Sequence, residues 1–543
     1  MISLLTEAWL PVRRKSGQVD WITPQQISEP DIVCFAASRA DFNGALAQFM
    51  IGLLQTTAPV KNEGAWDKLL DAPPSSDELE RWFAASAPAM VFDGDGARFM
   101  QDLGLADGAD CTIDALLIDA AGGSAIDKNT DHFVKRETVN HVCPHCAAMA
   151  LLTLQTNAPA GGAGHRTSLR GGGPLTTLNV SSPPVSLWQD LWLNVQPQGV
   201  FLARGDVQKS APYFTFPWLA ETASIQKPGA ETQPLSVHPY HVFWAMPRRI
   251  RLDFSDLQAG QCDLCKRESA TLLRRYVTKP QGLNYKGPWR HPFSPYYETK
   301  EGWLPVHPQP GGFSYRNWLA WVLNATEGKK QVQVAETVNY AFEKERQQPG
   351  GIGLWVFGYD MDNMKARCWY ETTFPLYTLA NSTQKSRKNL QELVSQQVEA
   401  AELAVFYLRQ AVRHAWFGEA ESRGDLSFID KAFWDSTEAP FYRQLRQMIQ
   451  QAGSDSGIDL MDAEYAMAQS RQWLAVLCKK VMHLFDSDLV GSASISQQDP
   501  RRFAKARFDL LRNLEGTALL KALRLPLPEK PVKKAPAKKA QPA

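Results

Sequence analysis

The chain of 543 residues carries 58 Lys and Arg against 57 Asp and Glu, a formal net charge of +1 that excludes nucleic-acid binding by bulk electrostatics. Hydrophobic residues make up 44% and charged residues 21%, which excludes global disorder. At about 150 residues per domain, the length predicts two to four compact units. Residues 525–543 hold five Lys and one Glu and contribute +4, so residues 1–524 carry −3. Binding of nucleic acid must then rely on local patches, or on an assembly that supplies positive charge elsewhere.

No stretch of the sequence approaches the roughly 20 apolar residues that a membrane-spanning helix needs, so we expect no membrane partner. The first residues, from Met1 to Glu7, lack the basic start and the long apolar core of a signal peptide. Eight cysteines in a chain of this length do not make a disulfide scaffold. We therefore expect a soluble protein of the cytoplasm.

Residues 1–375 are rich in Trp, Pro and Gly, and their short apolar runs are broken by turn residues. Two such runs, at residues 3–12 and 19–22, flank a turn and predict a hairpin. Residues 44–54 are a candidate helix, and the almost wholly apolar residues 146–154 predict a buried helix. Because strands and helices do not alternate regularly, the pattern favours a large mixed α+β domain over a doubly wound sheet.

After a linker at residues 376–389, the spacing of apolar residues changes to that of long helices. Four long amphipathic segments joined by short polar links predict an antiparallel four-helix bundle over residues 390–524. Residues 525–543 alternate Lys, Pro and Ala and are expected to be disordered.

The four helices of this bundle are predicted from apolar spacing and from end signals. Residues 390–416 place apolar side chains at the i, i+3/i+4 positions of one helix face, and further helices are expected at residues 433–449 and 463–484. The fourth begins at Asp499-Pro500, where Pro occupies the first helical position, and ends near Gly516.

Two Cys-x-x-Cys pairs are separated by 115 residues: Cys143 with Cys146, and Cys262 with Cys265. Each such turn supplies two sulfurs at the spacing that tetrahedral zinc needs, so two turns predict one structural Zn²⁺ site with four thiolate ligands. One alternative is two unrelated reduced pairs. Another is that His145 replaces a thiol, although a histidine that faces solvent from the turn is favoured.

The tetrapeptide Cys143-Pro144-His145-Cys146 has a further interpretation, because Cys-Pro-His-Cys at the start of a helix also occurs in strongly oxidising thioredoxin-fold enzymes. That chemistry needs an oxidising compartment and a surrounding βαβ pattern, and the sequence indicates neither. A cytosolic thiol- or zinc-dependent enzyme that uses this motif remains the alternative function.

A glycine-rich segment at residues 157–174 follows the predicted buried helix. It matches neither G-x-x-x-x-G-K-[ST] nor G-x-G-x-x-G, so a nucleotide cradle is not supported. Its backbone could lie against another molecule with no Cβ in the way, beside Arg166 and Arg170. A plain flexible connection is the alternative.

Residues 354–370 place two aromatic-rich strands around a polar tip and predict a projecting hairpin. Its tip contains Asn363, Met364 and Lys365. These residues could form an ordinary solvated turn, or a wedge that enters a base step. The sequence contains no H-E-x-x-H, no G-x-S-x-G and no phosphate loop, which favours a non-catalytic binding subunit.

These motifs together resemble the CasA family, the large subunit of the type I-E CRISPR Cascade surveillance complex, over about residues 1–520. The segments that carry the resemblance run in family order: 5–13, 99–101, Cys143-x-x-Cys146, 157–159 with the glycine segment, 169–172, Cys262-x-x-Cys265, 289–295 and 358–363.

The resemblance implies a non-catalytic subunit that recognises the protospacer-adjacent motif (PAM) in double-stranded DNA and promotes duplex opening for pairing with the crRNA. It also implies recruitment of the helicase–nuclease, and the other Cascade subunits as partners. In this family a glycine loop, a lysine and a hairpin wedge read the motif from the minor groove.

The family pattern is carried onto this sequence residue by residue. The glycine loop matches Gly162-Ala163-Gly164, with Ala163 where the family can have glycine. Lys279 matches the lysine that follows the second cysteine pair, with Lys286 as an alternative. Asn363, Met364 and Lys365 match the wedge, although the best-known member has a glutamine there. Phe133, within residues 122–141, matches the aromatic residue that anchors the subunit near the crRNA 5′ end, and a buried core ring is its alternative.

Overall fold

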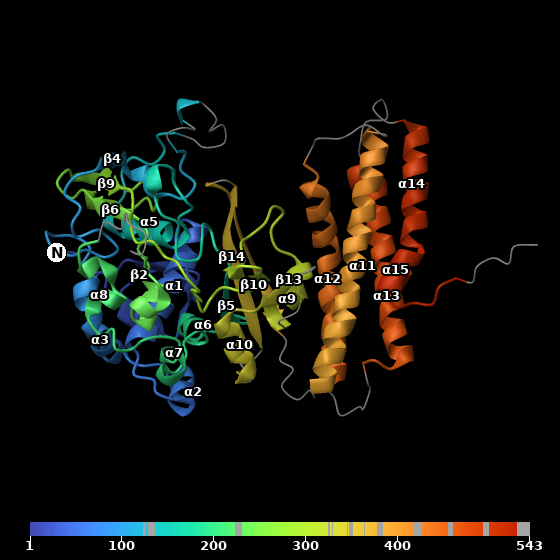
Figure 1. Cartoon of the computed structure of the whole chain (residues 1–543), viewed down its shortest axis with the longest axis horizontal. Helices are drawn as coiled ribbons and strands as arrows, with labels where there is room; N and C mark the ends of the chain where they lie inside the picture. Colours follow the sequence, from blue (N-terminus) through green and yellow to red (C-terminus); the bar gives the residue numbers. More distant parts are fainter. Residues whose placement is uncertain are drawn as a thin grey trace, which may run out of the picture. The chain divides into compact units, whose positions relative to one another are not determined.

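The computed structural model divides into two compact units, one of Met1–Phe313 with Ala320–Thr378 and one of Ser314–Leu319 with Leu379–Ala543 (Figure 1). It describes residues 1–122, 126–128, 136–222, 231–323, 326–327, 330–344, 346, 351–362, 364–376, 384–417, 425–453, 460–491 and 499–528. Within these residues, no helix is both long enough and apolar enough to cross a membrane.

The strands form small antiparallel sheets, with the orders β2-β1-β3, β11-β10-β13-β12, β15-β14-β5, β4-β9-β6 and β7-β8. Their bounds are β1 (Leu10–Arg14), β2 (Val19–Ile22), β3 (Ile32–Phe35), β4 (Ala109–Thr112), β5 (Thr176–Ser181), β6 (Arg249–Leu252), β7 (Gln258–Gln261), β8 (Glu268–Leu272), β9 (Arg275–Lys279), β10 (Tyr296–Thr299), β11 (Gly302–Pro305), β12 (Thr326–Glu327), β13 (Lys330–Gln333), β14 (Ile352–Asp362) and β15 (Lys365–Leu376).

The helices are mostly short before residue 350 and long after it. Their bounds are α1 (Ala40–Thr57), α2 (Glu63–Asp71), α3 (Ser76–Phe83), α5 (Pro144–Asn157), α6 (Leu187–Trp192), α7 (Gln198–Leu202), α8 (Pro212–Thr215), α9 (Trp318–Leu323), α10 (Glu336–Glu343), α11 (Gln384–Phe417), α12 (Ser427–Gly453), α13 (Ala463–His483), α14 (Pro500–Leu514) and α15 (Thr517–Ala522). The predicted mixed α+β region followed by a C-terminal helical bundle is confirmed.

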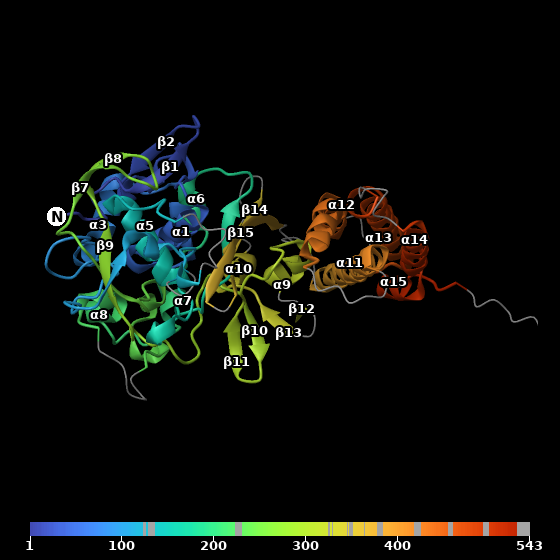
Figure 2. The ribbon, with the colours of Figure 1, turned by 90° about the horizontal axis from the view of Figure 1, so that it is seen from above.

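Helix α1 forms the centre of the first unit, and it packs along α5 (Figure 2). Its Phe49 ring meets the rings of Trp9, Phe99 and Trp244 edge-on, with centroid separations of 5.2, 5.7 and 5.8 Å. This aromatic core explains why a region so rich in Trp can fold around few regular elements. Both predicted helices of this region are confirmed, and each is longer than the predicted segment.

The two predicted hairpins are also confirmed. Strands β1 and β2 pair antiparallel, with Leu10 opposite Ile22. Strands β14 and β15 pair along their length, and β5 adds a third strand beside β14. Below its tip this second hairpin is fixed to α1, because the Tyr359 hydroxyl donates a 2.5 Å hydrogen bond to the buried Asp41 carboxylate at the start of that helix.

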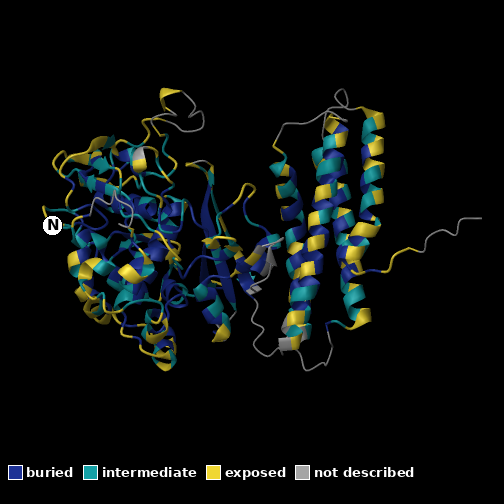
Figure 3. Cartoon of the chain, in the orientation of Figure 1, coloured by how far each residue is buried: buried dark blue, intermediate teal, exposed yellow. Residues whose placement is uncertain are grey.

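The second unit is a bundle of the long helices α11–α14, with buried side chains on their inward faces (Figure 3). Asp499 caps α14 by accepting hydrogen bonds from the backbone N–H groups of Arg501 and Arg502, as the Asp-Pro signal predicts. A distant segment, Ser314–Leu319, belongs to this unit because Tyr315 stacks on Phe441 with the ring centroids 4.2 Å apart. The spacing of apolar residues in the sequence does not predict that this segment packs on the bundle.

Candidate nucleic-acid interface and metal centre

Four cysteines from two distant segments meet in the first unit. Cys143 and Cys146 lie at the N-terminus of α5, and Cys262 and Cys265 lie in the turn between β7 and β8. All four Sγ atoms lie within 4.8 Å of one another. The prediction that the two pairs form one cluster is therefore confirmed, and the alternative of two unrelated pairs is wrong.

The geometry of this cluster fits a tetrahedral metal ion. A Zn–S distance of about 2.3 Å requires sulfurs about 3.8 Å apart, and Cys143 Sγ lies 3.8 Å from Cys265 Sγ. Backbone N–H groups of Cys143 and Cys146 point at the sulfurs of Cys262 and Cys143, at 3.3 and 3.5 Å. Hydrogen bonds from the Cys143 and Cys146 thiols lower the pKa of Cys265 to about 7, whereas hydrogen bonds to the other three cysteines and burial raise the pKa of Cys146. The four cysteines can hold a metal ion.

His145 does not join this cluster. Its ring lies beside Trp21, with the centroids 5.9 Å apart, and its Nε2 lies 3.9 Å from the Glu7 carboxylate. Burial lowers the pKa of His145 to about 4, so the imidazole is neutral at pH 7. The side chain is partly buried rather than facing solvent.

Residues Gly162–Gly164 form a single 3-10 turn, closed by a hydrogen bond from the Gly161 N–H to the His165 carbonyl at 3.0 Å. Gly162 and Gly164 are exposed, and the Ala163 side chain lies outside the described part of the chain. Arg248 contacts the start of this turn at Gly161, and its Nη2 donates a 2.5 Å hydrogen bond to the Pro159 carbonyl. The exposed glycine backbone can approach a flat or grooved surface closely.

Strand β9, which ends at Lys279, lies next to this turn. The Gln281 N–H, two residues after the end of β9, donates a 3.1 Å hydrogen bond to the Gly164 carbonyl and so connects the turn to this strand. Lys279 is opposite Arg249 of β6, which places two cations side by side on the sheet. The alternative lysine, Lys286, is exposed, and its N–H is bonded to the Thr232 carbonyl.

Lys279 and Arg249 each pair with a carboxylate of the loop at residues 102–108. Lys279 Nζ lies 2.5 Å from Asp107 Oδ1, and Arg249 pairs with Asp102. The loop can reach Lys279 because Gly108 lies against β9, where a Cβ would come within 2.5 Å of the Thr278 carbonyl oxygen. Because the sequence separates Asp107 from Lys279 by 172 positions, spacing alone does not reveal this pair.

The tip of the β14–β15 hairpin presents Met364 and Lys365 to solvent, and the Met364 side chain is 56% exposed. The glycine-rich segment meets the hairpin below its tip, because a Cβ on Gly173 would lie 2.7 Å from the Tyr359 carbonyl oxygen. The segment thus contacts both β9 and the hairpin. Asn363 and Phe133 lie outside the described residues.

Arg170, which the sequence places beside the glycine-rich turn, is not a surface cation. It is 4% exposed and donates hydrogen bonds to Thr176 and Ser294. Arg248, Arg249 and Asp107 are the charged residues around the turn that sequence reasoning missed. Only their proximity in the folded chain connects them to Lys279.

Solved structures with the same fold come from CRISPR systems. Thermus thermophilus CasA (Cse1) is 15% identical with a TM-score of 0.66, and the match covers 95% of this chain and 99% of that chain. Thermobifida fusca Cse1 is 14% identical with a TM-score of 0.69, covering 96% and 98%. A chain of a CRISPR RNA-guided surveillance complex is 14% identical with a TM-score of 0.64, covering 95% and 99%.

At these identities the structures establish the fold, and the sequence itself establishes the family. The family model of CRISPR-associated protein Cse1 matches residues 3–484. Because this match spans most of the chain, the protein belongs to the Cse1 family, which is the CasA family that its motifs resemble.

Proposed function

We propose that this chain is the non-catalytic large subunit of a type I-E Cascade complex, in which it recognises the PAM in double-stranded DNA. It would open the duplex for crRNA pairing and help to recruit a helicase–nuclease, in the cytoplasm and beside the other Cascade subunits. Membership of the Cse1 family supports this proposal. The net charge of −3 on residues 1–524 is compatible with such a subunit, because crRNA pairing and neighbouring subunits can supply most of the affinity for DNA.

The hydrogen bond from Gln281 to Gly164 is the observation that carries the proposal furthest. It joins an exposed glycine turn to the strand that ends at Lys279. A turn without side chains can approach the floor of a minor groove, and an ammonium group can donate to the N3 and O2 acceptors there. A few such contacts, worth about 1–3 kcal/mol each, are enough to discriminate a short motif.

The hairpin tip is proposed as the wedge. Met364 is an exposed apolar side chain at the end of two paired strands, which is the kind of group that unstacks a base step. Asn363 and Lys365 are proposed to act with it, by an amide contact and a phosphate contact respectively. Phe133 is proposed to anchor the subunit near the crRNA 5′ end.

The four-cysteine cluster is proposed to bind structural Zn²⁺. The ion would join the start of α5 to the β7–β8 turn, and the far end of α5 leads into the glycine turn. Four thiolates fill a tetrahedral site and leave no position for water, which favours a structural role over the alternative thiol- or zinc-dependent enzyme. We further propose residues 1–375 as the reading domain, 376–389 as a linker, 390–524 as the bundle and 525–543 as a solvated tail.

Gly162→Asp tests the proposal with little risk to the fold. A Cβ at Gly162 would meet nothing within 4 Å, so the substitution adds a negative charge without a steric clash. Reconstituted Cascade should lose binding to motif-bearing duplex and keep its assembly. Gly96→Asp, which also opens onto free space, is the matched control. Unchanged binding by Gly162→Asp would remove the turn from the interface and contradict the proposal.

A further inference from the structure

The guanidinium of Arg170 is buried in the first unit without a carboxylate partner. Its Nη1 donates to Thr176 Oγ1 and Ser294 Oγ, each at 3.0 Å, and its Nη2 donates to Gln48 Oε1. All three acceptors are neutral. In the described part of the chain, Arg170 forms no ion pair.

Several buried or partly buried arginines of the same unit pair with a carboxylate, whereas the buried Arg98 donates to the Gly94 and Leu252 carbonyls. Arg204 pairs with Glu336, Arg249 with Asp102 and Arg346 with Glu63. Buried charges are normally compensated because desolvation of an isolated ion is costly. Burial lowers the pKa of Arg170 only to about 10, so the group keeps its charge at pH 7.

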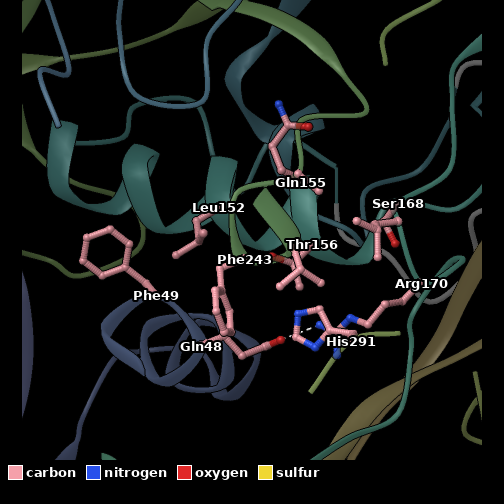
Figure 4. A pocket seen from close by; sticks show the side chains of 12 residues that line it. Gln48, Phe49, Leu152, Gln155, Thr156, Ser168, Arg170, Phe243 and His291 are labelled. Atoms are coloured by element: carbon pink, nitrogen blue, oxygen red, sulfur yellow. Dashed lines mark hydrogen bonds between the residues drawn. The ribbon is translucent and has the colours of Figure 1, made fainter. Parts of the chain in front are cut away.

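A small cavity adjoins this charge. It has a volume of about 30 Å³ and is partly open to solvent, and its wall includes Gln48, Gln155, Ser168, Arg170, Phe243 and His291. Figure 4 shows the Arg170 side chain extending past His291 to Gln48. This volume has room for roughly two water molecules, and so for one ion of halide size.

His291 offers a second donor to the cavity. Its Nδ1 accepts a 3.2 Å hydrogen bond from the Phe293 N–H, so the proton of the neutral ring is on Nε2. The ring is held between Phe243 and Phe293, with centroid distances of 5.8 and 5.0 Å. Nε2 has no partner among the described residues.

We propose that this cavity binds a small monovalent anion, with chloride as the ligand. The anion would accept hydrogen bonds from the Arg170 guanidinium and from His291 Nε2, and it would neutralise the buried charge. Arg170 joins α1, β5 and residues 291–294 through its three acceptors. Occupancy should therefore stabilise the packing beneath the turn at residues 168–171.

Crystals of the wild-type chain grown in sodium bromide test the site directly. We expect an anomalous bromide peak within hydrogen-bonding distance of Arg170 and His291. A water molecule in the cavity at high bromide concentration would overturn the proposal.

The Gln48→Glu variant provides an independent test in solution. Its carboxylate would pair with Arg170 and take the place of the anion. In wild type, replacing gluconate by chloride at constant ionic strength should raise the melting temperature by about 2–4 °C. Gln48→Glu should lose this response, whereas the exposed Gln18→Glu should retain it. Equal chloride responses in all three proteins would show a general salt effect and contradict the site.

Discussion

Lys279 Nζ lies 2.5 Å from Asp107 Oδ1, so the lysine that would read DNA is already paired with an acid of its own chain. The Asp107 side chain is 84% exposed and the Lys279 side chain 32% exposed. The ion pair lowers the pKa of Asp107, mainly through the hydrogen bond from Lys279, so the carboxylate stays charged. DNA would have to displace Asp107 to reach Lys279. A duplex without the motif offers Lys279 only phosphates, and the Asp107 carboxylate competes with them.

Asp107→Asn should therefore weaken discrimination. Without the competing charge, reconstituted Cascade should bind motif-free duplex more tightly, and the salt slope of that binding should steepen by about one ion. Filter binding over a salt series measures both quantities. Asp110→Asn, which removes a nearby exposed carboxylate that has no ion pair with Lys279, is the control. An identical salt slope in wild type and Asp107→Asn would contradict the competition.

The cysteine cluster predicts a coupled loss of metal and stability. Cys143→Ser should reduce zinc from about one ion per chain to nearly none and lower the soluble yield, because structural zinc binding is folding free energy. Metal analysis of the purified chain and its thermal melting measure these effects. Cys368→Ser, at an exposed cysteine away from the cluster, should change neither. A Cys143→Ser/Cys262→Ser variant with unchanged melting temperature would rule out a structural metal.

Asp190 predicts a pH-dependent stability. Burial raises the pKa of Asp190 to about 6, although its Oδ1 accepts hydrogen bonds from the Ser181 N–H and hydroxyl. Because the folded pKa lies above the unfolded value of about 3.9, protonated Asp190 favours the folded state below about pH 4. This contribution is lost as the pH rises through about 6.

Asp190→Asn should consequently stabilise the chain by about 1–3 kcal/mol at pH 8 and by much less at pH 4. Thermal melting across this range measures the difference. Asp71→Asn, at an exposed position, should show no such trend. A gain from Asp190→Asn that is the same at both pH values would argue against a titrating carboxylate.

The wedge predicts a kinetic defect. Asn363→Ala and Met364→Ala should spare the first encounter with motif-bearing DNA and slow strand opening, since a wedge acts when bases separate. Fluorescence of 2-aminopurine beside the motif follows the opening. A duplex that is already melted at that place should restore the rate. If neither variant is rescued in this way, the hairpin tip is not the wedge.

Much of the fold follows from local sequence signals. Asp499-Pro500 marks the start of α14, and two Cys-x-x-Cys turns indicate a cluster because their ligand chemistry is specific. The pair of Asp107 with Lys279 and the insertion of Tyr315 beside Phe441 could not be predicted. These relationships depend on tertiary contacts between distant segments, for which apolar periodicity carries no signal.

The burial of Arg170 is another tertiary feature that the sequence does not predict. An arginine followed by three glycines has the composition of an exposed loop cation, yet Arg170 is 4% exposed and its guanidinium donates to Thr176 and Ser294. Loop composition predicts backbone freedom and not the direction in which a long side chain points.

Equilibrium binding of Lys279→Ala Cascade to matched and motif-mutated duplexes tests whether Lys279 reads the PAM. We expect a loss of about 1–3 kcal/mol on the motif-bearing duplex and almost none on the motif-mutated one. Lys286→Ala should leave both affinities unchanged. An equal loss on both duplexes for Lys279→Ala would show a phosphate contact that carries no sequence information, and it would contradict Lys279 as the reader.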